Sequence, residues 1–278
     1  MGSNRRLEGK VAIVIGVSEG GIGKAVAMKL ASEGASVTVS SRTQSRIDKV
    51  AEEINASGGQ AIAVSADATI QDQIDAMVEA TVKRHGTVDI LFYNAGGGGR
   101  ARGAPTDIRI EDWRDTIEQN LTGAFICTQA VLKKMMLQQS GRIIITASGT
   151  GVRPVSGDMP AYGVANAGEI ALAKSLAAAT TYHGITVNVI CPGAVNSPEW
   201  NAVAARRFPS GVGGEPVNLE RFNQPEEVAD VVLFLASYES RALTGSVINL
   251  YFRSDMRAYS VWRETEPQYV ERPPKYKW

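Results

Sequence analysis

The sequence predicts one α/β domain built on a doubly wound parallel sheet of about seven strands. Short, continuous apolar segments recur along the chain, as expected for strands that helices cover on both faces. Longer segments that mix charged and apolar residues alternate with them, which is the order of a parallel sheet with crossover helices. The 278 residues show no internal repeat and no linker, so we expect a single domain.

The expected elements alternate along the chain. Strands are expected at residues 11–15, 35–42, 60–67, 88–96, 142–148, 185–193 and 246–250. Helices are expected after the first strand, ending at residue 30, and at about 44–57, 70–85, 110–137, 161–182 and 225–237. Gly86 follows a basic last turn, a typical helix end, and we interpret His85 in that turn as a cation at the helix terminus.

A glycine loop, GVSEGGIG at residues 16–23, stands between the first strand and its helix. This order places backbone N–H groups and a helix N-terminus against a phosphate. Glu19 within the loop is unfavourable beside a phosphate unless its side chain points to solvent. The loop therefore indicates a dinucleotide site and leaves the orientation of Glu19 open.

The end of the second strand indicates which dinucleotide is bound. It reads Ser40-Ser41-Arg42, and no acidic residue follows before Asp48. An acidic residue here favours NAD, whereas an arginine accommodates the 2′-phosphate of NADP. We therefore expect NADP, with NAD as the alternative. A solvated loop charge is the other interpretation of Arg42.

The composition excludes several functions. The 29 basic residues balance 29 acidic ones, so no net field favours nucleic acid or an anionic membrane. No apolar run reaches the roughly 18 residues of a membrane span, and residues 1–10 lack the apolar centre of a signal peptide. We expect a cytoplasmic protein that acts on a small molecule. Cys127 and Cys191 are interpreted as buried thiols, and no metal site is expected.

The segment from Ser148 to Asn166 is where we expect the chemistry. Ser148 ends an apolar strand, and Tyr162 opens an alanine-rich helix fourteen residues later. Upstream, Asn120 lies inside the expected 110–137 helix, where asparagine is slightly unfavourable. Either a local backbone hydrogen bond or a polar role in a site would explain it.

Taken in order, these motifs resemble the short-chain dehydrogenase/reductase family over about residues 7 to 250. The matching residues are the glycine loop, Asp67, Asn94-Ala95-Gly96, Asn120, Ser148, Tyr162, Pro192-Gly193 with Ser197, and Thr244-Gly245. The resemblance implies a Rossmann-type fold and NAD(P)-dependent redox chemistry. It also implies a homotetramer or homodimer that associates through the 110–137 and 161–182 helices.

The resemblance assigns expected roles. Ser148 orients a substrate carbonyl, Tyr162 exchanges a proton, and Asn120 holds a water molecule of a proton relay. The expected catalytic residues are Asn120, Ser148, Tyr162 and Asn166. The expected cofactor-binding residues are Gly16, Ser18, Gly21, Ile22, Gly23, Ser41, Arg42, Asp67, Ala68, Asn94, Ala95, Gly96, Tyr162, Asn166, Pro192, Gly193, Val195 and Ser197.

The chain departs from the family pattern in four places. The glycine loop has one extra residue between Gly16 and Gly21, and the spacing from Ser148 to Tyr162 is one longer than the commonest form. Residues 251–253, Tyr-Phe-Arg, replace an Asp-Gly-Gly. The largest departure is Asn166, at the position of the family's active-site lysine.

An asparagine at this position has a calculable consequence. The free pKa of tyrosine is about 10, and an ammonium group about 5 Å away, at an effective dielectric near 20, would lower it by about two units. Asparagine supplies no such charge, although it can still bind a ribose hydroxyl. Alcohol oxidation, which needs tyrosinate, would lose about a hundredfold, whereas carbonyl reduction needs neutral tyrosine. We therefore expect a reductase; redox-neutral chemistry on the same fold and a weakly active binding protein are the alternatives.

The last part of the catalytic domain, expected at residues 1–253, contains a long loop at 194–224. A loop of this length is typical of a lid over a site, and we expect it to bind the substrate. Trp200 and Phe208 could form apolar walls, and Arg206-Arg207 could contact an anion or lie on a solvated helix face. Residues 254–278 are expected to form an extended tail.

Overall fold

A computed structural model describes residues 5–153, 158–207 and 222–250. Within them, seven parallel strands form one sheet in the order β3-β2-β1-β4-β5-β6-β7. The single α/β domain with a parallel sheet is therefore confirmed. The strands are β1 (Val11–Ile15), β2 (Ser36–Ser40), β3 (Gln60–Ala63), β4 (Ile90–Tyr93), β5 (Gly141–Thr146), β6 (Ile185–Pro192) and β7 (Val247–Leu250).

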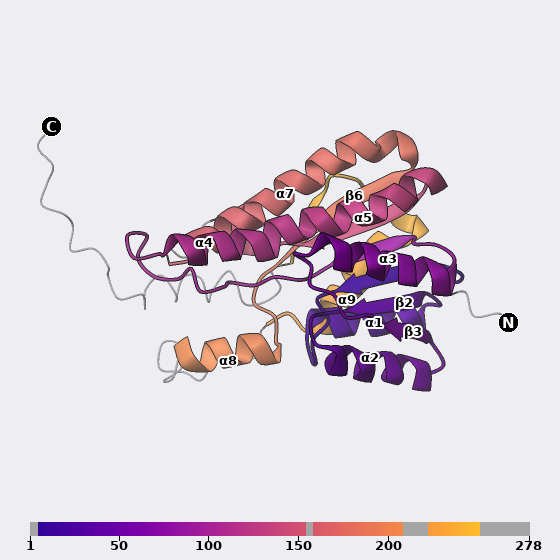
Figure 1. Ribbon diagram of the computed structural model, residues 1–278, viewed down its shortest axis with the longest axis horizontal. Helices are drawn as coiled ribbons and strands as arrows, with labels where there is room; N and C mark the ends of the chain where they lie inside the picture. The colour runs from indigo at the N-terminus through magenta and orange to yellow at the C-terminus, as the bar shows by residue number, and fades with distance from the viewer. Residues whose placement is uncertain (1–4, 154–157, 208–221, 251–278) are drawn as a thin grey trace, which may run out of the picture.

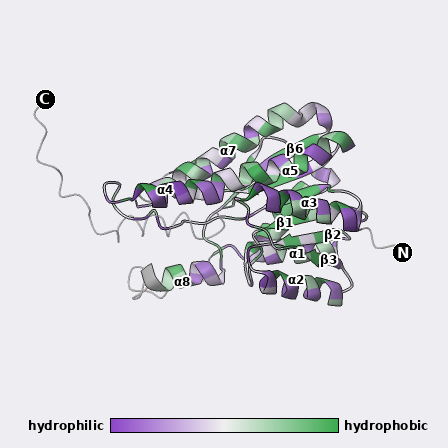
Figure 2. Ribbon diagram, viewed as in Figure 1, coloured by the Kyte–Doolittle hydropathy of each residue, from purple (hydrophilic) through white to green (hydrophobic). Residues whose placement is uncertain are grey.

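Helices cover both faces of this sheet (Figure 1). Side chains of α1, α2 and α9 join the core on one face, and side chains of α3, α5 and α7 join it on the other. The strands are apolar and the outer helix faces are mixed, as the hydropathy colouring shows (Figure 2). The helices are α1 (Ile22–Ser32), α2 (Gln44–Ala56), α3 (Gln71–His85), α4 (Ile110–Ile117), α5 (Gly123–Gln138), α6 (Gly149–Val152), α7 (Pro160–Thr180), α8 (Pro198–Arg207) and α9 (Pro225–Ala236).

The strand order reverses between β1 and β4, and ligands of such sheets bind beyond the carboxyl ends at this point. Ile15 pairs with Tyr93, so the segments that begin with Gly16 and Asn94 leave the sheet side by side. A Cβ on Gly16 would lie 2.5 Å from the Asn94 carbonyl carbon and oxygen, and the φ of Gly16 is +87°. Only glycine fits there.

The third and fourth strands are shorter than expected, at Gln60–Ala63 and Ile90–Tyr93, and two other expected elements differ in kind. The expected 110–137 helix is interrupted by a π-helical turn at Glu118–Thr122, within which the Asn120 side chain donates to the Thr116 carbonyl oxygen. The expected 194–224 loop contains α8, which begins at Pro198 and has Glu199 in its first turn, both common at helix N-termini. Phe208, the side chains of Arg206 and Arg207, and residues 251–278 lie outside the described residues.

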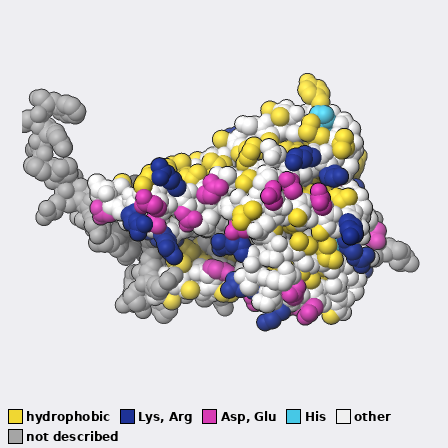
Figure 3. Space-filling model, in the orientation of Figure 1, with side chains coloured by type: hydrophobic (Ala, Val, Ile, Leu, Met, Phe, Trp, Pro, Cys, Tyr) yellow, Lys and Arg dark blue, Asp and Glu magenta, His cyan; other side chains and the backbone are white. Residues whose placement is uncertain are grey.

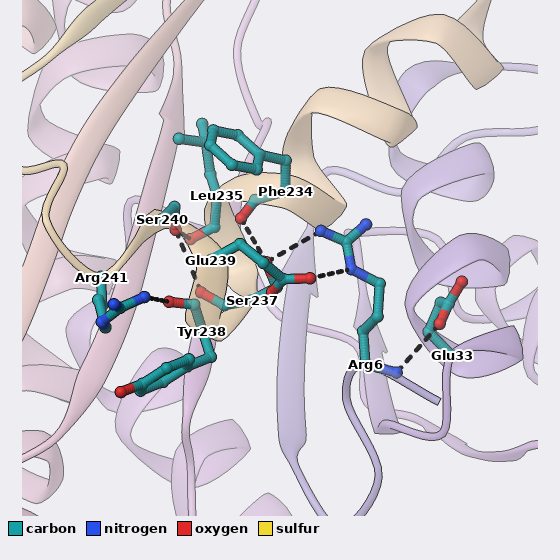
Figure 4. A network of polar contacts seen from close by, with 9 residues as sticks. All are labelled: Arg6, Glu33, Phe234, Leu235, Ser237, Tyr238, Glu239, Ser240 and Arg241. Carbon is teal, nitrogen blue, oxygen red and sulfur yellow. Dashed lines mark hydrogen bonds and ion pairs between the residues drawn. The ribbon is translucent and has the colours of Figure 1, made fainter. Parts of the chain in front are cut away.

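The N-terminal segment is fastened to the chain after α9 by a polar network (Figure 4). Arg6 donates to the Glu239 carboxylate at 2.8 Å and to the Ser237 hydroxyl at 3.2 Å. The pKa of Glu239 is lowered to about 2. The largest cause is the hydrogen bond with the Ser237 side chain, followed by a backbone hydrogen bond and then by the contact with Arg6. None of the described helices has the length and apolar character that crossing a bilayer requires.

Candidate active site

The glycine loop presents a helix N-terminus to the sheet edge. α1 begins after Gly21, and no side chain caps the N–H groups of its first turn. A Cβ on Gly21 would collide with the Ser18 hydroxyl, and one on Gly23 would lie 2.9 Å from the Val17 Cα, so strand and helix meet without a side chain between them. These free N–H groups and the positive end of the helix dipole suit an anion such as a pyrophosphate.

Glu19 is paired rather than free. Its carboxylate contacts the Lys24 ammonium at 2.5 Å, and Lys24 also contacts Glu53 at 2.9 Å. Burial lowers the pKa of Lys24, but the bonds to Glu19 and Glu53 outweigh it and leave the pKa above its ordinary value. The ion pair offsets the negative charge of Glu19 beside the phosphate loop.

A cavity of about 380 Å³ opens at the carboxyl ends of β1, β2 and β4. Twelve of the eighteen expected cofactor residues line it: Gly16, Ser18, Gly21, Ile22, Ser41, Arg42, Asp67, Ala68, Asn94, Ala95, Gly96 and Ser197. The other six do not line it: Gly23, Tyr162, Asn166, Pro192, Gly193 and Val195. The cavity therefore corresponds to the loop and strand-end half of the expected site, and the helix α7 residues lie outside it.

The Arg42 end of the cavity is more basic than the sequence indicated. Arg46, on the first turn of α2, lines the cavity together with Arg42 and Thr43. Both arginines are exposed, and neither has an ion pair among the described residues. The sequence did offer a signal for Arg46. It lies four residues after Arg42, in the first turn of a helix that begins at residue 44.

Asp67 closes the cavity on the side of β3. Its carboxylate accepts hydrogen bonds from the Thr69 backbone N–H at 3.0 Å and the Thr69 hydroxyl at 2.8 Å. Burial raises the pKa of Asp67, but the Thr69 bonds and the charge of Arg42 bring it below its ordinary value. Asp67 is therefore an ionised acceptor at neutral pH.

Asn120 fastens the glycine-rich strand end to the π-helical turn. Its amide oxygen accepts from the Gly97 N–H at 2.9 Å, and its amide nitrogen donates to the carbonyl oxygens of Gly97 at 3.1 Å and Thr116 at 2.7 Å. The side chain is 3% exposed. A Cβ on Gly96 would collide with its amide oxygen. The local backbone hydrogen bond, one of the two explanations that the sequence left open, is therefore present, and a polar role in a site stays a prediction.

Ser148 and Tyr162 meet at the start of two helices. Ser148 is the N-cap of α6, where its hydroxyl accepts from the Thr150 N–H at 3.3 Å, and Tyr162 lies in the first turn of α7. Burial raises the pKa of the Tyr162 phenol, and its hydrogen bond with Ser148 opposes this rise. Glu169 also raises the pKa, Asn166 and Arg102 lower it, and the balance lies above the ordinary value. The phenol of Tyr162 therefore keeps its proton at physiological pH.

Asn166 lies one turn after Tyr162 and is 1% exposed. Its amide nitrogen donates to the Tyr162 carbonyl oxygen at 2.7 Å. A Cβ on Gly151 would lie 2.6 Å from the Asn166 carbonyl carbon, so α6 covers this point of α7 closely. The side chain is held by its own helix and brings no charge to the phenol.

The segment after β6 contacts β7 and Asn223, and its helix α8 begins beside the glycine loop. Gly193 donates its N–H to Leu250 at 3.0 Å, and Val195 bridges to Asn223. Ser197 accepts from the Trp200 N–H at 3.2 Å, and Pro198 would lie 3.0 Å from a Cβ on Gly20. The first turn of α8 therefore packs beside the phosphate loop.

Comparison with known proteins gives consistent matches. A sequence profile described as "Enoyl-(Acyl carrier protein) reductase" matches residues 16–250. The 3-oxoacyl-[acyl-carrier-protein] reductase of Synechocystis is 37% identical over 255 residues, covering 88% of this chain and 96% of the relative. The corresponding reductase FabG of Thermotoga maritima is 35% identical, covering 88% and 97%.

Solved structures of two reductases have the same fold as this chain. Levodione reductase superposes with a TM-score of 0.83 at 28% identity, covering 91% of this chain and all of the other. A variant actinorhodin polyketide ketoreductase solved with NADPH gives a TM-score of 0.79 at 32% identity, covering 88% and 96%.

Proposed function

Because the chain belongs to the short-chain dehydrogenase/reductase family of oxidoreductases, we propose that it is an NADPH-dependent reductase of a small-molecule ketone or aldehyde. The observation that carries the proposal is the hydrogen-bonded pair of Ser148 and Tyr162, in which the raised pKa keeps the phenol protonated. A protonated phenol is a general acid for carbonyl reduction, not a base for alcohol oxidation.

NADP(H) is the cofactor, and the residues of the cavity fit it. The uncapped N-terminus of α1 would hold the pyrophosphate, and the Arg42–Arg46 pair would hold the 2′-phosphate. The chemistry that NADPH supplies when bound is a hydride. The ketoreductase solved with NADPH supports the same assignment.

The chain's own residues provide the rest of the reaction. Ser148 donates to the substrate carbonyl oxygen and fixes its orientation. Tyr162 donates its proton to the same oxygen as negative charge develops there. Asn120 keeps the Gly96–Gly97 backbone in place beside the site through its two bonds to Gly97. Of the six expected cofactor residues that do not line the cavity, Gly23 lies in the glycine loop beside Val17. We assign the other five, which are Tyr162, Asn166, Pro192, Gly193 and Val195, to the half of the site around Tyr162.

Asn166 takes the place of the active-site lysine and sets the direction of the reaction. Without an ammonium group, formation of tyrosinate is disfavoured and oxidation is slow at neutral pH. Reduction is unaffected, since it starts from the neutral phenol. The redox-neutral and binding-only alternatives have less support, because the relatives' printed names describe reduction or dehydrogenation.

A homodimer or homotetramer in the cytoplasm completes the proposal. Phe125, Leu137 and Val164 are 46%, 83% and 50% exposed on α5 and α7, and hydrophobic side chains gather on the surface over these helices (Figure 3). Apolar helix faces of this kind favour association. The buried free thiols Cys127 and Cys191 suit a reducing compartment.

Nicotinamide fluorescence and absorbance test this function. NADPH is expected to bind more tightly than NADH, and a panel of 3-oxoacyl thioesters, cyclic diketones and aldehydes is expected to yield NADPH oxidation. Tyr162→Phe should bind NADPH like the native protein and lose about 100-fold or more in kcat. Tight binding without turnover of any carbonyl compound would contradict the proposed reduction. Oxidation of NADPH by enoyl thioesters alone would replace it with double-bond reduction.

A further inference from the structure

Glu169 is a buried carboxyl group that the reaction described so far does not use. It is 1% exposed, and neither carboxyl oxygen has a hydrogen-bond partner among the described residues. No lysine, arginine or histidine of the described part forms an ion pair with it. Burial raises the pKa of Glu169 well above its ordinary value. Burial therefore favours the neutral carboxylic acid over the carboxylate.

Glu169 lies on the face of α7 that carries the active-site residues. It follows Asn166 by three residues and Tyr162 by seven, and these spacings place the three side chains on one face of the helix. Side chains of a helix lean toward its N-terminus, so the carboxyl group is directed toward the turn of Asn166. Along this face, Asn166 comes between Glu169 and Tyr162 in the order of residues.

One of the groups near Glu169, Tyr93, is hydrogen-bonded to Asn120. The ionisable groups that interact with its charge are Tyr162 on α7, Tyr93 on β4 and Cys191 on β6. The Tyr93 hydroxyl donates to the Asn120 carbonyl oxygen at 3.1 Å and to that of Gln119 at 3.0 Å. A Cβ on Gly123 would lie 2.7 Å from this hydroxyl, so glycine allows its approach.

The buried carboxyl group of Glu169 lowers the stability of the fold, so its presence calls for a functional explanation. A buried polar group with no partner destabilises the folded state, and a leucine would avoid that loss. Buried water molecules relieve it by bonding to otherwise unsatisfied polar groups. A hydrated carboxylic acid on the active-site face of α7 can hold and transfer a proton.

We propose that Glu169 is a positioning residue that acts through Tyr162. After each reduction it returns a proton to the Tyr162 phenol, and the proton travels through buried water molecules that pass Asn166. This rests on the reduction proposed above. In the family pattern a lysine stands where Asn166 is, so position 166 brings no ammonium group to Tyr162. Glu169 is the ionisable group that the same helix face provides instead.

The proton balance of the step is complete. The Tyr162 O–H bond breaks as the alcohol O–H bond forms, which leaves a tyrosinate. The Glu169 O–H bond then breaks, a water chain passes the proton, and the Tyr162 O–H bond forms again. The Glu169 carboxylate takes a proton from solvent. No electron moves in this relay, and one proton is consumed for each carbonyl reduced.

Rapid mixing separates this role from a structural one. Tyr162 starts protonated, so Glu169→Gln should give a first turnover of NADPH oxidation at the native rate. Later turnovers should be slower by about tenfold or more, with a larger solvent isotope effect. Glu169→Asp should recover part of the steady rate. Thr180→Val, on the same buried face of α7, is the matched control and should show equal first and later turnovers at native rates.

The measurement uses the carbonyl compound of the panel with the highest kcat/KM. If first and later turnovers are slowed equally in Glu169→Gln, or neither is slowed, the relay is wrong while the reductase function stands. An infrared band of a protonated carboxylic acid at neutral pH, absent in Glu169→Gln, is expected in the native protein. Its absence would also overturn the relay, even if no substrate were known.

Discussion

The Asn166 amide nitrogen lies 2.7 Å from the Tyr162 carbonyl oxygen and donates a hydrogen bond to it. Tyr162, the proposed proton donor, is therefore bonded to a neutral group of its own helix. Burial dominates the pKa of the phenol and raises it, so the tyrosine keeps its proton. Together, these features favour reduction over oxidation.

The two arginines at the end of the cavity should determine NADPH preference. Arg42→Ala and Arg46→Ala are each expected to weaken NADPH binding by about 10- to 100-fold, since each removes a charge-assisted contact worth about 1.5–3 kcal/mol. NADH binding should change little. Fluorescence titration measures both constants. Arg109→Ala, an exposed arginine on another segment, is the control, and an equal loss for both nucleotides would contradict the assignment.

The Lys24–Glu19 pair should protect the phosphate loop from its own carboxylate. Lys24→Ala is expected to weaken NADPH binding by about 1 kcal/mol, or roughly fivefold, because Glu19 then faces the phosphates unpaired. Removing the carboxylate as well, in Glu19→Gln with Lys24→Ala, should restore binding. Lys29→Ala, on the same helix and paired with Asp230 instead, is the control. A double variant as weak as Lys24→Ala would show that Lys24 acts directly.

Asn120 should contribute to activity beyond its contribution to stability. Asn120→Ala is expected to cost about 1–3 kcal/mol of unfolding free energy and to lower kcat, because the Gly97 backbone loses both of its bonds to the amide. Asn55 is a matched control, since its amide makes the same two bonds to Ala61 far from the site. Urea unfolding and steady-state rates measure the two effects. Equal loss of activity in both variants would contradict a specific role.

The fold could be predicted because its signals are local and repeated. Apolar strand segments, glycine stops and the order of strands and helices each act within a few residues. The π-helical turn was not predicted, because the Asn120 contact to Gly97, a residue 23 positions away, has no local signal in the sequence. α8 was missed for a similar reason, since a long proline-containing segment is typical of a loop.

The site could be predicted in part. The glycine loop, Arg42, Asp67 and the Asn94–Gly96 segment line one cavity, as their positions at strand ends indicated. The partner of Glu19 could not be foreseen, because it required the position of Lys24 on the next helix. Glu169 was missed, although an acid seven residues after Tyr162 in an alanine-rich helix was a readable signal.

Glu169 should reduce stability as the pH rises. Its folded pKa lies above the ordinary value of 4.5, so the folded protein holds a proton that the unfolded chain has already lost. The unfolding free energy of the native protein should therefore fall, relative to Glu169→Leu, as the pH rises above about 4.5. At neutral pH, Glu169→Leu is expected to be more stable by about 1–3 kcal/mol. Urea unfolding at several pH values measures this, and a difference independent of pH would contradict it.

The central claim is that Asn166 makes the protein a reductase by leaving Tyr162 protonated, and the pH dependence of Asn166→Lys tests it most directly. Carbonyl reduction and alcohol oxidation would be measured across the pH range in the native protein and in this variant, each also with Glu169→Gln. The second background is needed because a lysine at 166 could pair with Glu169 one turn away. We expect the oxidation rate at neutral pH to rise by about 100-fold and its pH midpoint to fall by about two units. Unchanged oxidation rates and midpoints in both backgrounds would contradict the account.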